Sequence, residues 1–305
     1  MEVHSRRVLY ENHAEIRLPM ASTTKILTAI TVLNKQADLD AVVTIPAQAE
    51  GVEGSSVYLK SGEKYSIKDL LYGLMLRSGN DCATALALYQ SGSIADFAAE
   101  MNENAQKAGA LSSNFKNPHG LPCEGHYTTA KDLALITCYA MENPTFCEIV
   151  ATKYYEPLHW TNKNKLLSLY EGGIGVKTGY TKQAGRCLVS AAKRKNMRIV
   201  SVLLNCPTTY ERTISLFDDA FSAFEYTTIV KKGEKFSTKI DGKEFTAYAK
   251  EEFAYPIWKE ELNQLEIRTN FDNVKVKKSK KDEIIGQFEI YLSKRLLFSG
   301  NLYKL

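Results

Sequence analysis

Helical spacing of hydrophobic residues prevails in this chain up to about Tyr226 and alternation prevails beyond it, and this change limits the folds that the chain can adopt. Upstream, apolar side chains recur every three or four residues, as at Ile26, Ala29, Ile30 and Leu33, which is typical of one face of a helix. Downstream, apolar and polar residues alternate in short segments such as KEFTAYA and GQFEIYLS, which predicts strands. We therefore expect two parts of different architecture.

The first part combines helical patterns with a smaller number of strand patterns. Further helical spacing covers three segments: Ile94–Ala108, Thr129–Met141 and Glu211–Phe224. Gly172–Lys177 predicts a short strand, and Cys187–Ala192 with Arg198–Leu204 predicts two strands joined by a polar turn. Helices around an antiparallel hairpin form an α+β domain. We therefore expect an α+β domain over residues 1–226 and a small all-β domain over residues 227–305.

Capping residues predict where several of these helices begin and end. Ser66 and Asp69 resemble a capping box ahead of an apolar run. Asp81 is typical of the N-cap of a helix that starts after Ser-Gly-Asn. Gly109 fits a C-terminal stop, and Asn143-Pro144 predicts the end of the helix before it.

The composition excludes several functional classes. A net charge of +4 over 305 residues, with no basic stripe interleaved with aromatic residues, argues against a nucleic-acid partner. The basic run Lys275–Lys281 predicts a solvated hairpin tip, with contact to an anionic surface as the alternative. The six cysteines form no CxxC pair and no zinc spacing, so we expect no metal or cofactor. Cys187 and Cys206 lie in apolar runs, which predicts buried thiols.

Neither a membrane span nor an intact signal peptide is expected. No apolar run is long enough to cross a bilayer. The first residues, MEVHSRRVLYENHAE, contain two arginines but no apolar stretch of the kind a signal peptide needs.

Three short motifs occur in an informative order. They are Ser22-Thr23-Thr24-Lys25, Ser78-Gly79-Asn80 and Lys177-Thr178-Gly179. The order Ser-x-x-Lys, Ser-x-Asn, Lys-Thr-Gly is the signature of penicillin-binding proteins and class A β-lactamases. It supplies a serine nucleophile, a lysine that can take its proton, and polar groups that can hold a peptide.

Single motifs are not specific, because look-alikes occur elsewhere in the chain. Ser-x-x-Lys also begins at Ser61, Ser113 and Ser190, and Ser-Gly-Asn recurs at Ser299. Ser61 lies in a glycine-containing turn, Ser113 in a loop, and Ser190 at the expected end of a strand. Only Ser22 precedes a clear amphipathic helix, where residues three apart are neighbours.

The chemistry of acyl transfer suggests a role for each motif residue. Ser22 becomes a nucleophile when Lys25 removes its proton. That requires a neutral amine, which burial and the nearby charge of Lys177 favour. Ser78 can relay a proton to the leaving amine, and Asn80 can bond both Lys25 and a substrate amide.

The third motif suits substrate binding. Lys177 and Thr178 can hold a substrate carboxylate, and Gly179 lets the substrate approach the strand closely.

On these motifs the chain resembles the low-molecular-weight penicillin-binding proteins of the D-alanyl-D-alanine carboxypeptidase type. The resemblance runs from about Val8 to the end and includes longer stretches: LPMASTTKILTA, LLYGLMLRSGNDCATALA, FKNPHGLP, HYTTAKDLA and GVKTGYTKQAGRCLVSAAKR. It implies a transpeptidase-like domain, with a central antiparallel sheet and a helical subdomain, followed by a β-rich domain. It also implies removal of the terminal D-alanine from peptidoglycan stem pentapeptides. Ser22 would form an acyl-enzyme that water hydrolyses, and β-lactams would acylate the same serine.

The resemblance adds two further expectations about the site. The backbone N–H groups of Ser22 and Tyr180 would form the oxyanion hole, often the largest stabilising contribution in acyl transfer. Arg212, at the start of a helix, would help to bind the terminal carboxylate, unless it is simply an exposed arginine.

Members of this family are exported, so we expect the protein to act outside the cytoplasm. Many members end in an amphipathic helix that lies on the membrane. The end of this chain, YLSKRLLFSGNLYKL, predicts a final strand and tail instead. Peripheral membrane attachment of a full-length form is therefore only a hypothesis.

Three alternative functions remain open at this point. A class A β-lactamase needs a glutamate that activates the deacylating water, and the segment LSSNFKNPHGLPCEG offers only Glu124. A D,D-endopeptidase that cuts cross-linked peptidoglycan would use the same residues. A catalytically silent penicillin-binding scaffold is a third alternative, against which the intact motifs argue.

Overall fold

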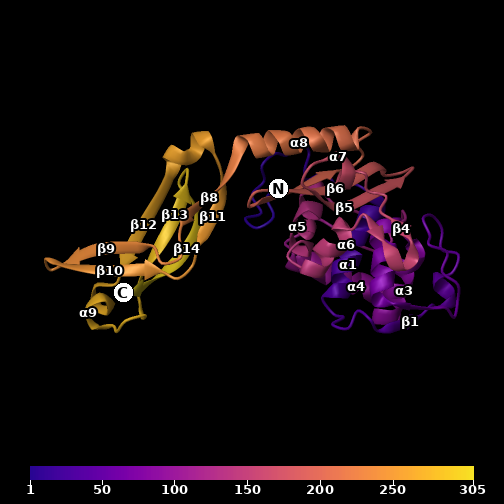
Figure 1. Ribbon diagram of the computed structural model, residues 1–305, viewed down its shortest axis with the longest axis horizontal. Coiled ribbons are helices and arrows are strands. Elements are labelled where there is room, and N and C mark those ends of the chain that lie inside the picture. The colour runs from indigo at the N-terminus through magenta and orange to yellow at the C-terminus, as the bar shows by residue number, and fades with distance from the viewer. The chain divides into compact units, whose positions relative to one another are not determined.

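The computed structural model describes residues 1–305, which form two compact units, Met1–Ala220 and Phe221–Leu305 (Figure 1). The first unit is α+β and the second is built almost entirely of strands. Each unit has its own buried apolar cluster. The predicted architecture, an α+β domain followed by an all-β domain, is confirmed.

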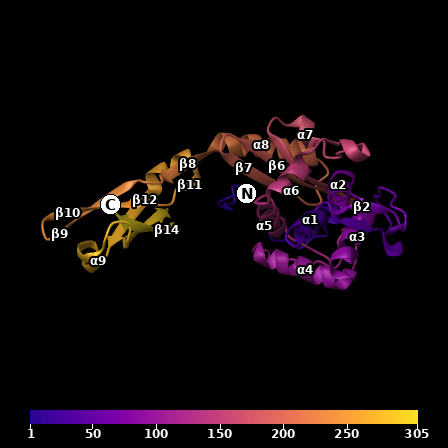
Figure 2. The same ribbon diagram turned by 60° about the horizontal axis from the view of Figure 1, so that its bottom comes forward.

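A three-stranded antiparallel sheet runs through the first unit in the order β5–β6–β7. Its strands are β5 (Gly173–Thr181), β6 (Gly185–Arg194) and β7 (Met197–Leu203). Helix α8 (Thr209–Ala223) and helix α5 (Ala130–Ala140) lie on opposite sides of this sheet (Figures 1 and 2). The strand predicted to end at Lys177 continues to Thr181, so the Lys-Thr-Gly motif lies wholly inside β5. Ser190, expected at a strand end, lies inside β6.

Helices and helical turns make up the rest of the first unit. They are the 3-10 turn η1 (Ala21–Thr24), α1 (Lys25–Leu33), η2 (Ala47–Ala49), α2 (Ile67–Tyr72), the π-helical turn η3 (Gly73–Arg77), α3 (Asn80–Ser91), α4 (Ile94–Lys107), α5, α6 (Pro144–Ala151), η4 (Glu156–Leu158), α7 (Leu166–Leu169) and α8. Two short strand pairs accompany them: β1 (Val42–Thr44) with β2 (Lys64–Ser66), and β3 (Tyr154–Tyr155) with β4 (Trp160–Thr161).

The helix ends follow the capping chemistry, with one correction. The Ser66–Asp69 capping box at α2 is confirmed, and Gly109 follows α4 with φ +87°, a conformation that glycine adopts without strain. Helix α5 ends before Asn143-Pro144, as predicted. The same pair begins α6: the Asn143 side chain accepts from Phe146 N, and proline is tolerated in the first turn. The prediction that Asp81 is an N-cap was wrong, because α3 begins at Asn80.

The core that supports the motifs is drawn from α1, the helices around it and the sheet. In α1 the side chains of Ile26, Leu27, Ala29 and Ile30 are at most 1% exposed. They share one cluster with Val189 and other residues on one face of the sheet. Because α1 is buried on nearly all sides, the turn that precedes it is held rigidly against the sheet.

The second unit contains a five-stranded antiparallel sheet in the order β12–β13–β14–β10–β9 and a two-stranded sheet of β11 and β8. Its strands are β8 (Phe224–Val230), β9 (Lys235–Ile240), β10 (Lys243–Ala249), β11 (Phe253–Trp258), β12 (Leu265–Phe271), β13 (Ile284–Leu292) and β14 (Arg295–Lys304), with η5 (Lys259–Gln264) between β11 and β12. The chain end forms strand β14, as predicted.

The basic run at Lys275–Lys281 is not a hairpin tip. Most of it lies in the short helix α9 (Asn273–Lys278), whose N-terminus is capped by Asp272 and whose Val276 is fully buried. Val274, Lys275, Val276 and Lys277 alternate as in a strand, but the segment forms a short helix, with Val276 packed in the core of the second unit.

All six cysteines are free thiols. Cys187 is buried in β6, as predicted. Cys206 is only half-buried, because β7 ends at Leu203 and Cys206 lies in the connection to α8. No helix in the structure combines the length and apolar character that a membrane crossing requires.

Candidate active site

Ser22 and Lys25 lie at the junction of η1 and α1. Ser22 is inside the 3-10 turn, and Lys25 is the first residue of the α-helix. A spacing of three residues places both side chains on one face, and Lys25 Nζ lies 3.0 Å from Ser22 Oγ. The first motif therefore forms a hydrogen-bonded pair, as its spacing predicts.

Two carbonyl oxygens fix the amine of Lys25. Nζ donates to Asn80 Oδ1 at 2.6 Å and to the backbone oxygen of His119 at 2.7 Å. A neutral amine has two N–H groups and one lone pair, and neither carbonyl can donate in return. In the neutral form both N–H groups are used by the carbonyls, and the lone pair is left for the Ser22 hydroxyl.

The electrostatic surroundings favour that neutral form. The side chain of Lys25 is 0% exposed, and burial lowers its pKa well below the ordinary lysine value, assisted by the charges of Lys177 and Lys163. Asp81 and Cys82 act in the opposite direction but more weakly than burial and Lys177. Lys25 can therefore accept a proton from Ser22.

The second motif lies in the connection between η3 and α3. Ser78 has left-handed backbone geometry, with φ +66°, and is 5% exposed. This residue turns the chain so that Asn80, the first residue of α3, points at Lys25. The loop before β2 holds Asn80: its backbone N donates to Ser55 O at 2.7 Å, and its Nδ2 donates to Glu53 O at 2.5 Å.

The third motif borders η1. Lys177 is 2% exposed, and its Nζ donates to Thr178 O at 3.0 Å. Burial, with a smaller contribution from the charge of Lys163, lowers the pKa of Lys177 to about 7. A Cβ on Gly179 would lie 3.1 Å from the backbone N of Ser22, so β5 runs directly against the turn that carries the serine. Tyr180, the next residue along β5, is 65% exposed.

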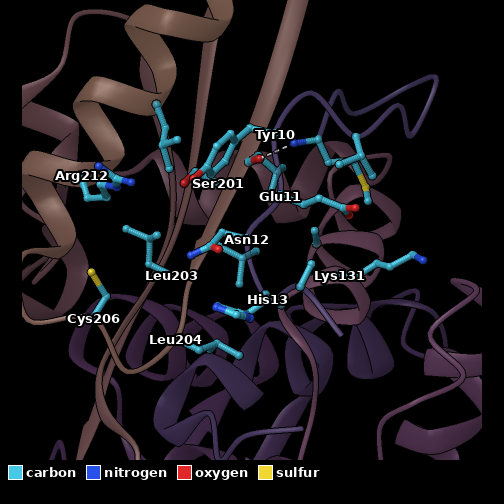
Figure 3. A pocket seen from close by; sticks show the side chains of 18 of the residues that line it. Tyr10, Glu11, Asn12, His13, Lys131, Ser201, Leu203, Leu204, Cys206 and Arg212 are labelled. Carbon is cyan, nitrogen blue, oxygen red and sulfur yellow. Dashed lines mark hydrogen bonds between the residues drawn. The ribbon is translucent and has the colours of Figure 1, made fainter. Parts of the chain in front are cut away.

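Arg212 lies apart from these residues. It sits in the first turn of α8 and lines a cavity of about 490 Å³ between α8, β7 and residues 8–16. Figure 3 shows Arg212 at this cavity together with Ser201, Leu203 and Cys206. None of the other predicted site residues lines the cavity.

The loop that contains His119 also contributes to the site, although the three motifs do not include it. Asn117 braces this loop, because its Oδ1 accepts from Gly120 N at 2.7 Å and its Nδ2 donates to Leu121 O. Asn117, Pro118 and Gly120, within four residues, are typical of a tight turn and are the sequence signal for this loop.

His126 ties the same loop to the nucleophile turn. Lys116 N donates to Nδ1 of His126, so Nε2 carries the proton and donates to Thr24 Oγ1 at 3.0 Å. Burial lowers the pKa of His126 to about 4 and that of His119 to about 3. Both rings are therefore neutral near neutral pH and serve as supports. No three His, Cys, Asp or Glu side chains converge as metal ligands.

Two family models together match most of the chain. The family model described as D-alanyl-D-alanine carboxypeptidase, Peptidase S11, matches residues 1–208, and the penicillin-binding protein 5 C-terminal domain matches residues 224–305. The chain is 33% identical over 249 residues to the D-alanyl-D-alanine carboxypeptidase DacF of Bacillus subtilis, covering 77% of this chain and 64% of that protein. It is 34% identical over 256 residues to DacC of Escherichia coli, covering 78% of this chain and 64% of that protein.

A solved structure extends the similarity over the whole chain. Penicillin binding protein 5 from Haemophilus influenzae aligns with a TM-score of 0.81 at 27% identity, covering 100% of this chain and 94% of that one. The matches to the DacF and DacC sequences, by contrast, span about 64% of those relatives' length.

Proposed function

The chain belongs to the D-alanyl-D-alanine carboxypeptidase family, and we propose that it is itself a serine-type D,D-carboxypeptidase. Its substrate would be the peptidoglycan stem pentapeptide, from which it removes the terminal D-alanine. β-Lactams would acylate the same serine. One observation supports this most strongly: the buried Lys25 amine lies within hydrogen-bond distance of Ser22 Oγ and of two carbonyl acceptors.

The proposed reaction begins when Lys25 takes the proton of Ser22. The serine oxygen attacks the carbonyl carbon of the penultimate D-alanine, and the backbone N–H groups of Ser22 and Tyr180 stabilise the oxyanion. Ser78 passes its proton to the leaving amine and regains one from Lys25, so that the C–N bond breaks, D-alanine departs and Lys25 is neutral again. Water then attacks the ester while Lys25 takes its proton. Lys25 returns that proton to Ser22 Oγ as the ester C–O bond breaks, and the shortened peptide is released.

Recognition of the terminal carboxylate would fall to Lys177 and Thr178. A buried ammonium is costly unless it has an anionic partner, and the lowered pKa of Lys177 reflects that cost. A bound carboxylate would compensate for it and favour the charged form. Gly179 lets β5 lie directly against η1, because a Cβ there would come within 3.1 Å of Ser22 N and Thr23 N, and its lack of a side chain would let the substrate approach the strand.

For Arg212 we propose a helper role at the same carboxylate. The side chain faces the cavity beside β7 in this structure, so the role requires it to turn toward β5. Arg212→Leu tests this directly: an unchanged KM for pentapeptide would remove Arg212 from the site.

Release of D-alanine from a synthetic pentapeptide tests the proposed function. We expect release by the native protein and none by Ser22→Ala with its fold intact. Cleavage of a cross-linked peptide dimer at a comparable rate would favour an endopeptidase instead. Absence of D-alanine release and of penicillin labelling would favour a silent scaffold, and rapid β-lactam turnover would favour a β-lactamase.

We also propose that the protein acts outside the cytoplasm, where peptidoglycan stem peptides are exposed. Attachment of a full-length form to the membrane surface would complement this location. Fractionation of cells that express the complete gene product, with the protein recovered on the outer side of the membrane, is the corresponding test.

A further inference from the structure

We propose that Asp81 is a positioning residue for acylation: its carboxylate fixes the loop Glu53–Leu59, and that loop fixes the Asn80 amide against Lys25. The inference rests on the proposed function of the site, which it extends by one residue outside the three motifs. It also implies that the loop Glu53–Leu59 affects the rate of acylation, because the loop positions Asn80.

Asp81 is a fully buried carboxylate that is satisfied by the loop and not by a cation. Its exposed fraction is 0%. Oδ2 accepts from Ser56 Oγ at 2.5 Å, from Val57 N at 3.0 Å and from Leu59 N at 3.2 Å, and Oδ1 accepts from Cys82 N at 2.9 Å. Burying an ionised carboxylate is costly unless hydrogen bonds compensate it. Here most of the compensating donors belong to one loop, so that loop is held to the start of α3.

The other half of the same loop holds Asn80. Glu53 O accepts from Asn80 Nδ2, and Ser55 O accepts from Asn80 N. With Nδ2 committed to a carbonyl, the amide oxygen is left to face Lys25 Nζ at 2.6 Å. An amide rotated the other way would present its NH₂ group to the amine and lose both bonds. The loop therefore decides which end of Asn80 meets Lys25.

Close packing of the loop against Asn80 supports its role in orienting the amide. Gly54 has φ +93°, and a Cβ there would lie 2.8 Å from Asn80 Nδ2. The backbone thus approaches the amide as closely as a glycine allows. Asp81 fastens residues 56–59 immediately after this contact, so a released loop would leave Asn80 without its two partners.

The charge of Asp81 has a second effect, on the amine itself. The charged and titratable groups around Lys25 are Lys177 on β5, Lys163 before α7, Asp81 and Cys82 on α3, and His119 in the loop opposite. Asp81 raises the pKa of Lys25 against the dominant effects of burial and Lys177. Removing its charge therefore lowers the pKa of Lys25 further, and the neutral amine persists to lower pH.

The test compares Asp81→Asn with Asp132→Asn. Asp132 is also buried, at 5% exposure, and it accepts from Ser112 N and Ser113 Oγ, both at 2.7 Å. Neither of those serines bonds Lys25 or Asn80, so this variant makes the same chemical change without touching the amide. The readouts are the rate of acylation by a fluorescent penicillin across a pH series, the kcat/KM for pentapeptide, and the melting temperature.

We expect Asp81→Asn to slow acylation at its pH plateau by at least ~10-fold, since a displaced catalytic group costs that much or more. Its acid limb should move to lower pH. Asp132→Asn should lower the melting temperature while leaving the rate and the pH profile within about twofold, because its hydrogen bonds contribute to stability alone.

Ser56→Ala separates anchoring from charge. It removes one bond to Asp81 and keeps the carboxylate, so acylation should slow by ~3-fold or more, the order of one lost hydrogen bond, with the pH profile in place. If Asp81→Asn fails to fold, Ser56→Ala still tests whether the bonds between Asp81 and the loop affect acylation. Folded variants that acylate like the native protein, with an unmoved acid limb, overturn the inference. A native protein that neither binds penicillin nor releases D-alanine overturns the proposed function instead.

Discussion

Replacing Gly120 by alanine should disable the site from outside the three motifs. Gly120 has φ +89°, and it follows His119, whose carbonyl accepts from Lys25. An alanine Cβ would overlap the carbonyl oxygen of Ala21 and lie 2.9 Å from Thr24 Oγ1. Real Cβ contacts essentially never fall below 3.0 Å, so the loop has to withdraw from η1 by roughly 1 Å, a displacement that can cost on the order of 10²-fold in rate.

Gly109→Ala provides the matched control. Gly109 has φ +87°, almost the same backbone conformation, and a Cβ there would meet nothing within 4 Å. Both variants bear the cost of a left-handed alanine, about 1–2 kcal/mol, but only Gly120→Ala adds the overlap, which costs a further ~1–3 kcal/mol. The control should therefore lose some stability and keep its acylation rate.

The assay is the second-order rate of labelling by a fluorescent penicillin, measured well below each variant's melting temperature. We expect Gly120→Ala to react on the order of 10²-fold more slowly than the native protein and Gly109→Ala to react within about twofold. If a folded Gly120→Ala protein labels at the native rate, the His119 carbonyl does not position Lys25, and the reasoning is refuted.

Three further predictions concern charge, capping and the second unit. Lys163→Gln removes a positive charge that lowers the pKa of Lys177. Because Lys177 then keeps its proton to higher pH, the alkaline limb of the pH profile of kcat/KM for pentapeptide should move upward from about pH 7. An unmoved limb would show that the titration of Lys177 does not cause it. Ser66→Ala breaks the capping box of α2 and should cost ~0.5–2 kcal/mol of unfolding free energy with acylation unchanged, whereas unchanged stability would contradict the capping role. Phe288→Ala removes a fully buried ring that stacks on Phe236 and should destabilise the second unit by ~3–5 kcal/mol. Calorimetry should show a separate unfolding transition at lower temperature, while penicillin labelling persists. Loss of labelling would show that the stability of the first unit depends on the second.

The order and spacing of the motifs predicted much of the site. Ser22 and Lys25 are three residues apart on a helical path, so their contact follows from local geometry. The change of hydrophobic period at about Tyr226 likewise predicted the two architectures, because helices and strands bury their faces with different spacing.

Contacts made by the backbone could not be read from residue types. The His119 carbonyl reaches Lys25 from 94 residues away, and any residue has a carbonyl. Asp81 was expected to cap its own helix, but its carboxylate faces the loop Glu53–Leu59. An aspartate near a helix start suits both tasks, and only the path of the distant loop decides between them.

In the second unit, too, one element could not be predicted from its residue types. Lys275–Lys281 contains mostly lysines, which gave no apolar period to follow, and the single buried Val276 placed the segment in a helix. One apolar residue cannot set a period, so its packing was decided by the neighbouring strands.

Peptide mapping of the penicillin adduct tests the role of Ser22 most directly. The native protein should gain the mass of one opened β-lactam, carried by the peptide that contains Ser22. Lys25→Ala should slow the appearance of that adduct by ~10²–10⁴-fold, the usual contribution of general-base catalysis. An adduct on another residue, or Lys25→Ala labelling at the native rate, would contradict a Ser22 nucleophile activated by Lys25.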